Sequence, residues 1–345
     1  MKKLNIIYAA VALLGIMTTG CEVEVKSDTD NIKELDINAL LTPDTTMMVT
    51  VTSARSFKDF SIEDYIDFSD YEEHNYRDDL VKQTAVSTAT VTATVNDTDV
   101  YELTYNASNY NYQCDYRPKE GDVIKIQAQA EGYPVAEAQA EIPRHQLIEV
   151  LGYEKFYDPM SYETDANTAA DTVARITMRI TDPADETNYY RLKVRSAVKM
   201  EEPEDSEDTY YHFGDTYFFK DAFYSDDAIF KNVSLHKGYW GWAAGMSNVF
   251  NDNLINGRTH EFTVETRLRD GRQYFDDGTY SAENKWVVVE LQSISLDFYK
   301  YLNTVWLYRI TDRNAYSETV QIFSNVTGGW GIVGALSTEK HIIRF

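Results

Sequence analysis

The sequence predicts a mainly β protein, with an N-terminal immunoglobulin-like sandwich followed by a second β-rich domain that holds one or two short helices. Three observations lead to this prediction. Apolar and polar residues alternate with a period of two in several short segments, which is typical of half-buried antiparallel strands. The chain contains 26 Tyr and 15 Phe, and aromatic residues favour strands. Its 345 residues are enough for about two domains.

Residues 1–20 have the parts of a bacterial lipoprotein signal peptide. Lys2 and Lys3 provide the positive charge, and the apolar stretch 4–17 leads through small residues to Cys21. That stretch is shorter than the ~20 residues that a membrane-spanning helix needs. We therefore expect that residues 1–20 are removed and that Cys21 carries the lipid. Simple cleavage that leaves Cys21 as a free thiol is the alternative.

Residues 21–33 are polar and charged, so they are expected to form a flexible tether. The first domain, residues 34–144, is expected to be the immunoglobulin-like sandwich, because several short alternating strands follow one another closely. Residues 56–83 are dense in Asp, Glu and Tyr and are interpreted as a long insertion loop. The residues predicted to face the core of this domain are Ala89, Val91, Ala93, Val95, Ile124, Ile126, Ala128, Ala136, Ala138, Ala140 and Ile142.

The second domain, residues 145–345, is predicted to contain two alternating strands, at 174–180 and 190–195, joined by a turn at Asp182 and Pro183. If these strands pair, five cations share one face of an otherwise acidic protein. One interpretation is that they neutralise acidic neighbours such as Glu261 and Glu265. The other is a cationic patch for a partner or an acidic ligand. The five candidates are Arg175, Arg179, Arg191, Lys193 and Arg195.

A helix is predicted near residue 300, with Ser295 as its N-terminal cap. Its apolar stripe follows helical spacing and would lie on a core. The stripe consists of Phe298, Tyr301, Leu302 and Val305.

The formal net charge of −24 disfavours nucleic acid as a partner, because an acidic surface repels phosphate backbones. The same charge disfavours adsorption to anionic lipid, which leaves the N-terminal lipid as the expected membrane contact. With Cys21 lipidated, Cys114 has no cysteine to pair with and is interpreted as a small buried apolar residue.

Aromatic residues among glycines give one candidate binding segment. Tyr239, Trp240 and Trp242 lie in the segment HKGYWGWAAG, where the two indoles would share one face of a strand. Exposed indoles could stack on the sugar rings of a glycan. The alternative is that these side chains fill the core.

The sequence contains no GxSxG, HExxH or CxxC motif, and its six histidines are widely scattered. The acidic run 201–208 is interpreted as a solvated loop, with a low-affinity calcium site as the alternative. The glycines at 328, 329, 331 and 334 are interpreted as closing the last strand rather than as a phosphate loop, because no lysine follows at the required spacing. We expect no catalytic residue, metal or cofactor.

Several segments, in this order and spacing, resemble a Bacteroidetes family of outer-membrane lipoproteins, domain of unknown function 4249. They include LDINALLTPDTTMMVTVTSA, PKEGDVIKIQAQAEGYPVAEAQAEIP and the ending SETVQIFSNVTGGWGIVGALSTEKHII. The resemblance implies a lipid anchor in the outer membrane and a non-catalytic accessory role beside a TonB-dependent receptor for nutrient uptake. It leaves open whether the protein faces the periplasm or the cell surface. An independent glycan- or peptide-binding lipoprotein is the second hypothesis, and a hydrolase is the third.

Overall fold

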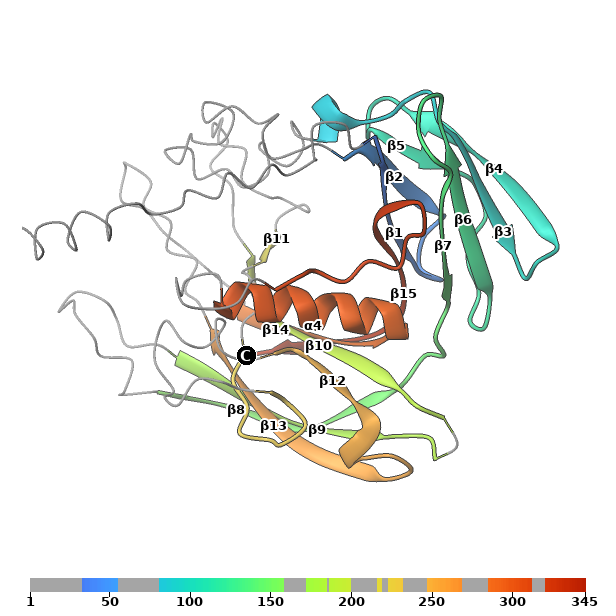
Figure 1. Cartoon of the computed structure of the whole chain (residues 1–345). Coiled ribbons are helices and arrows are strands. Elements are labelled where there is room, and N and C mark those ends of the chain that lie inside the picture. Colours follow the sequence, from blue (N-terminus) through green and yellow to red (C-terminus); the bar gives the residue numbers. More distant parts are fainter. Residues whose placement is uncertain are drawn as a thin grey trace, which may run out of the picture. The chain divides into compact units, whose positions relative to one another are not determined.

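The computed structural model describes residues 33–54, 81–157, 172–184, 186–199, 216–218, 223–231, 247–268, 285–311 and 320–345. In this part of the chain the strands form a 12-stranded sheet and a three-stranded sheet, which confirms the mainly β prediction (Figure 1). The longer sheet has the order β11-β10-β14-β15-β1-β2-β5-β4-β3-β6-β7, with β12 paired to β10, and the shorter one has the order β13-β9-β8.

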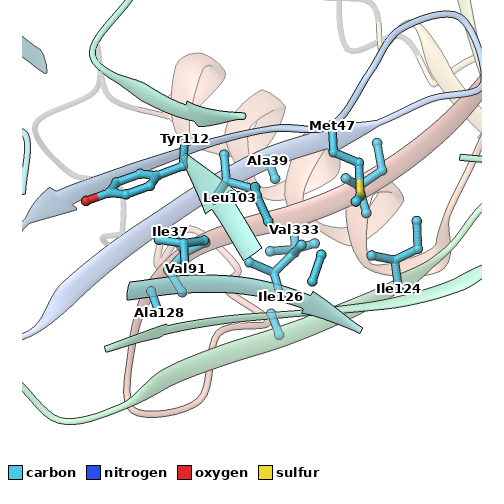
Figure 2. Close-up of a cluster of buried hydrophobic side chains, with 14 of the residues drawn as sticks. Ile37, Ala39, Met47, Val91, Leu103, Tyr112, Ile124, Ile126, Ala128 and Val333 are labelled. Carbon is cyan, nitrogen blue, oxygen red and sulfur yellow. The ribbon is translucent and has the colours of Figure 1, made fainter. Parts of the chain in front are cut away.

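The first sandwich is built from seven strands and the start of the last one. Alternation places the apolar side chains inward, as predicted, and Ile37, Val91, Ile124 and Ile126 are fully buried in one cluster (Figure 2). Cys114 packs against this cluster and is half-buried. The strands are β1 (Leu35–Leu41), β2 (Met48–Ser53), β3 (Thr90–Val95), β4 (Asp99–Asn106), β5 (Asn111–Gln113), β6 (Val123–Gln129) and β7 (Ala136–Glu141).

Strand β4 belongs to both layers of the first sandwich and connects them. Its first half pairs with β3 as far as Leu103, and its second half pairs with β5 from Thr104 onward. The strands on the two sides of β4 therefore bury their apolar faces against each other in one core.

The last strand, β15 (Gly329–Arg344), belongs to both parts of the fold. Residues 329–335 pair in parallel with β1, and residues 336–344 pair antiparallel with β14 (Lys285–Ile294). Val333 and Ala335 are consequently buried in the first core, although the strand follows the whole second domain in the sequence.

The glycines at the start of β15 allow a close approach of backbones, rather than only a turn. Gly331 has a φ of +105°, and a Cβ atom there would overlap the carbonyl oxygen of Ile37. A Cβ atom at Gly334 would lie 2.9 Å from ring atoms of Phe298. Side chains at these two positions would push β15 away from β1 and from the helix.

The second sandwich places the three-stranded sheet against β10, β14 and β15, with one core between them. Ile176, Met178 and Val264 contribute to this core from one sheet, and Leu192 and Val289 contribute from the other. The remaining strands are β8 (Ile148–Tyr157), β9 (Thr172–Thr181), β10 (Tyr189–Lys199), β11 (Thr216–Phe218), β12 (Val249–Asn251) and β13 (Thr259–Leu268), and the 3-10 helix η3 spans Asp252–Leu254.

The pairing of β9 with β10 that was considered above does not occur, since the two strands lie in different sheets. Both strands have one apolar face, and those faces contribute to the same core instead of sharing one sheet surface. Asp182, where a hairpin turn was predicted, begins the connection between the sheets and accepts a hydrogen bond from Tyr190 Oη (2.6 Å). The five cations therefore point away from the shared core on two separate faces.

The predicted helix is α4 (Leu296–Thr311). Phe298, Tyr301 and Leu302 of its apolar stripe pack with Ile332 and Leu336 of β15. The Ser295 cap is only partly as predicted. The Ser295 carbonyl accepts from Tyr299 N (2.9 Å), but its hydroxyl accepts from Ala335 N (3.1 Å) and so ties β15 to the helix start. Within the described residues, no helix has the length and apolar character required to cross a bilayer.

Candidate functional site

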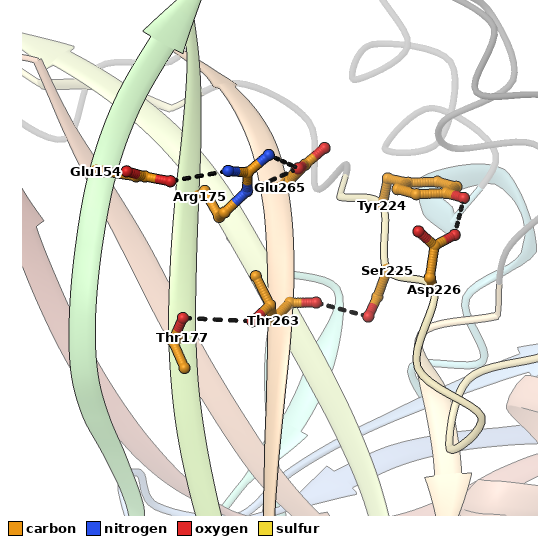
Figure 3. A network of polar contacts seen from close by, with 8 residues as sticks. All are labelled: Glu154, Arg175, Thr177, Tyr224, Ser225, Asp226, Thr263 and Glu265. Atoms are coloured by element: carbon orange, nitrogen blue, oxygen red, sulfur yellow. Dashed lines mark hydrogen bonds and ion pairs between the residues drawn. The ribbon is translucent and has the colours of Figure 1, made fainter.

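The outer face of the three-stranded sheet carries two rows of charged side chains. In the Arg175 row, Arg175 donates from Nε and Nη2 to Glu265 Oε1 (3.0 and 2.8 Å) and from Nη1 to Glu154 Oε1 (2.8 Å), as Figure 3 shows. These carboxylates raise the pKa of Arg175, chiefly through the hydrogen bonds with Glu265. The guanidinium of Arg175 also lies over the ring of Phe156, and its carbon atom is 4.4 Å from the ring centroid.

The Arg179 row repeats this arrangement. Arg179 donates from Nε to Glu261 (3.0 Å) and from Nη1 to Glu149 (3.1 Å). Each row thus places one guanidinium of β9 between a carboxylate of β13 and a carboxylate of β8. The interpretation that Arg175 and Arg179 neutralise Glu265 and Glu261 is confirmed, while the carboxylates from β8 were not foreseen.

The two edges of the three-stranded sheet differ. Along β13, Tyr224 exchanges two backbone hydrogen bonds with Glu265 (2.8 Å each), and Ser225 Oγ donates to the Thr263 carbonyl (2.7 Å; Figure 3). Along the outer side of β8, no other described residue forms a backbone hydrogen bond. The edge at β13 is therefore covered, whereas no segment within the described residues covers the edge at β8.

The remaining three candidate cations lie on β10, on the face of the long sheet that points away from the core. Glu290 of β14 accepts from Arg195 Nη2 (2.7 Å) and lies 3.5 Å from Lys193 Nζ. Arg191 is on the same face of β10. Burial raises the pKa of Glu290, but the charges of Lys193 and Arg195 outweigh that effect, and the pKa lies below the ordinary carboxyl value.

We expect Glu290→Gln to lower the free energy of unfolding by about 2 kcal/mol at pH 7, because it removes this carboxylate from the partly buried cations Lys193 and Arg195. Since folding lowers the pKa of Glu290, its contribution is present above the ordinary carboxyl pKa and is lost as the pH falls. Urea unfolding at pH 7 and pH 4 measures both effects. The exposed Glu154→Gln is the matched control and should cost less than about 0.5 kcal/mol. Equal effects of the two changes would contradict this assignment.

Several predicted site residues lie outside the described part of the chain. These are the lipid attachment residue Cys21 and the aromatic candidates Tyr239, Trp240 and Trp242. The acidic run 201–208 is also outside it. The candidate sites that the structure describes are therefore the two charged rows and the cluster of Glu290 with Lys193 and Arg195.

The sequence did not reveal the polar contacts that join β15 to the segment connecting the two sandwiches. His145 Nε2 lies 2.9 Å from Glu339 Oε2, and His341 Nε2 lies 3.1 Å from Glu339 Oε1. Ser337 Oγ donates to the Pro143 carbonyl (2.7 Å). Because His145 and Glu339 are 194 positions apart, no local pattern could have indicated this contact. Across the described residues, no group of three or more His, Cys, Asp or Glu side chains is placed to hold a metal ion.

A family model described as "Domain of unknown function (DUF4249)" matches residues 21–342. No curated protein matches the chain.

Proposed function

The chain belongs to the DUF4249 family, and on this premise we propose that it is a non-catalytic outer-membrane lipoprotein that assists a TonB-dependent receptor in nutrient uptake. The family match begins at Cys21, the first residue after the expected signal peptide. This coincidence supports a mature protein that starts with a lipidated cysteine.

The observation that carries the binding role is the three-stranded sheet, with its two charged rows and its exposed β8 edge. Such an edge offers backbone groups and side chains to a protein partner. Two strongly bound polar groups inside the fold serve the structure instead. Asp122 and Asp182 each accept hydrogen bonds from a tyrosine hydroxyl and from a backbone N–H.

In the proposed mechanism the lipid holds the protein at the membrane, where the receptor is concentrated. Confinement of both partners raises their effective concentration, so a modest affinity suffices for the complex. The protein then captures the nutrient at the mouth of the receptor or gates its entry. The acidic surface, with a formal charge of −24, keeps the body of the protein off anionic lipid.

Affinity purification of the tagged, lipidated protein from gently solubilised outer membrane tests this proposal. We expect a TonB-dependent receptor at near-stoichiometric amount by quantitative mass spectrometry. The same tag on an unrelated outer-membrane lipoprotein is the control. Recovery of the protein without a receptor would contradict the accessory role.

We expect Cys21→Ser to abolish incorporation of labelled palmitate and to move the protein from the membrane fraction to the soluble fraction. Acyl chains contribute ~0.8 kcal/mol per buried methylene, so their loss removes the proposed anchor. Cys114→Ser is the matched control, because Cys114 is the other cysteine of the chain and is half-buried against the first core. Labelling that persists in Cys21→Ser would show that another residue is acylated.

A further inference from the structure

We propose that the exposed edge of β8 accepts an extended, basic segment of a partner protein as a fourth strand of the three-stranded sheet. This inference rests on the proposed binding function and names its surface and the chemistry of the partner. It is carried by the geometry of the edge, by the charges along it and by the sequence that already pairs with β8.

The edge is long and accessible. The strand β8 has 10 residues, and the exposed fractions are 54% for Tyr153, 37% for Leu151 and about 60% for the side chains of Glu149 (63%) and Glu154 (62%). On the other side of the sheet the segment at Tyr224 and Ser225 already covers β13. Among the residues that the structure describes, a strand can therefore be added at β8 but not at β13.

The charges favour a basic occupant. Each row contains two carboxylates and one guanidinium, and the carboxylate at the β8 end is the more exposed of the two, though only slightly in the Arg179 row (63% for Glu149 and 53% for Glu261). In the Arg175 row, for example, the side chain of Glu265 is 10% exposed and that of Glu154 is 62% exposed. A cation on an added strand would extend each row with alternating sign, and opposite charges across strands stabilise a sheet.

The chain itself shows which sequence pairs with β8. Residues 175–179 of β9 read Arg-Ile-Thr-Met-Arg, with arginines opposite Glu154 and Glu149 and Thr177 opposite Gly152. On the opposite face of β8, Tyr153 lies against Phe345, so apolar residues of an added strand would cover both rings. The expected partner segment therefore has two cations four residues apart, with apolar residues between them on the other face.

A second copy of this chain is a poor occupant of the edge. A symmetric antiparallel pair of β8 strands centred between Leu151 and Gly152 would place Glu149 of one copy opposite Glu154 of the other, and like charges in that position are destabilising. The register shift between Val150 and Gly152 further interrupts such pairing. Charge and geometry thus disfavour pairing of two β8 strands, but they do not disfavour pairing of β8 with a basic strand.

A peptide with the sequence of residues 172–181, TVARITMRIT, is the direct probe, and TVAEITMEIT is its matched control. With the labelled peptides and the full mature protein, fluorescence anisotropy should show saturable binding of the arginine peptide only. Binding should weaken as salt is raised, because exposed ion pairs are screened. Hydrogen exchange should slow at residues 148–157 when the arginine peptide binds.

The double variant Glu149→Gln/Glu154→Gln should weaken binding of the arginine peptide about tenfold. Glu120→Gln/Glu131→Gln removes two exposed carboxylates from the first sandwich and should leave binding unchanged. Both double variants retain the fold, since the substituted side chains are exposed. Absence of binding, equal binding of the two peptides, protection elsewhere than at β8, or a dimer that depends on these glutamates would each overturn the inference.

The outcome is separable from that of the receptor purification. A receptor that co-purifies equally well with the Glu149→Gln/Glu154→Gln variant would support the accessory role and exclude β8 as its contact. Peptide binding at β8 without any co-purified receptor would support β8 as an edge that accepts a strand and would contradict a TonB-dependent receptor as the partner.

Discussion

Gly331→Ala is expected to lower the free energy of unfolding by more than about 3 kcal/mol. Two costs act together at this position. Its φ of +105° lies in a region that residues with a Cβ atom rarely adopt, and the added Cβ would overlap the carbonyl oxygen of Ile37. Because this oxygen belongs to the backbone of the neighbouring strand, relief requires β15 to separate from β1 along their parallel pairing.

Two other glycines separate these costs. Gly121 has a φ of +82° but no atom within 4 Å of an added Cβ, so Gly121→Ala should cost about 1 kcal/mol from backbone strain alone. Gly152 has neither a positive φ nor a close neighbour, and Gly152→Ala should change stability by less than about 0.5 kcal/mol. Urea unfolding of the three variants measures the series. If Gly331→Ala lowered the free energy of unfolding no more than Gly121→Ala does, the close approach of β15 to β1 would be contradicted.

Asp122→Ala is expected to destabilise the protein by about 3 kcal/mol. The Asp122 side chain accepts from Asn96 Nδ2 (2.9 Å), Tyr116 Oη (2.6 Å) and Lys119 N (2.8 Å). The Asp122 residue is only 7% exposed, and its removal leaves the donors of three part-buried hydrogen bonds without their acceptor. These bonds join the turn after β3 to the start of β6, and the loss should loosen that end of the first sandwich.

The pH dependence of this site has a defined sign. Burial raises the pKa of Asp122, but the hydrogen bonds from Tyr116, Asn96 and Lys119 outweigh burial, and the pKa is below the ordinary value. Its stabilising contribution is therefore present above the ordinary carboxyl pKa and is lost as the pH falls through the folded-state value. Thermal unfolding between pH 7 and pH 2 should show a smaller loss of stability in Asp122→Asn than in the wild type. Parallel curves would show that Asp122 does not contribute to acid unfolding.

The faces of individual strands were predictable from the sequence because they depend on local alternation. The inward positions named for β3, β6 and β7 are buried, apart from Ala89, which precedes β3 and is only partly buried. The helix also followed from its stripe of apolar residues at helical spacing. Each of these predictions uses the period of one segment alone.

The pairing of segments was not predictable in the same way. An amphipathic strand can bury its apolar face within its own hairpin sheet or against another sheet, and the alternation is identical in both cases. For this reason the sequence left open a pairing of β9 with β10, whereas the two strands lie in opposite layers. The glycines before β15 indicated an unusual backbone, but not that β1 is the strand it approaches.

The candidate site was foreseen in part. Opposite charges at alternating positions indicated that Arg175 and Arg179 meet Glu265 and Glu261, and they do. That β8 supplies the third member of each row and has one exposed edge depends on the order of strands in the finished sheet. Sheet order involves contacts between distant segments, which no local period encodes.

The path of β15 also sets the order in which the protein can be completed during synthesis. The indole of Trp330 hydrogen-bonds Glu34 at a separation of 296 positions, so a ribosome makes one partner long before the other. Domains commonly fold in the order in which they emerge, but here the sheet of the first sandwich lacks its parallel neighbour until the second domain has been translated. A nascent chain that stops before Gly329 leaves β1 as an open edge, so only a nearly full-length product closes the sheet and escapes proteolysis at that edge.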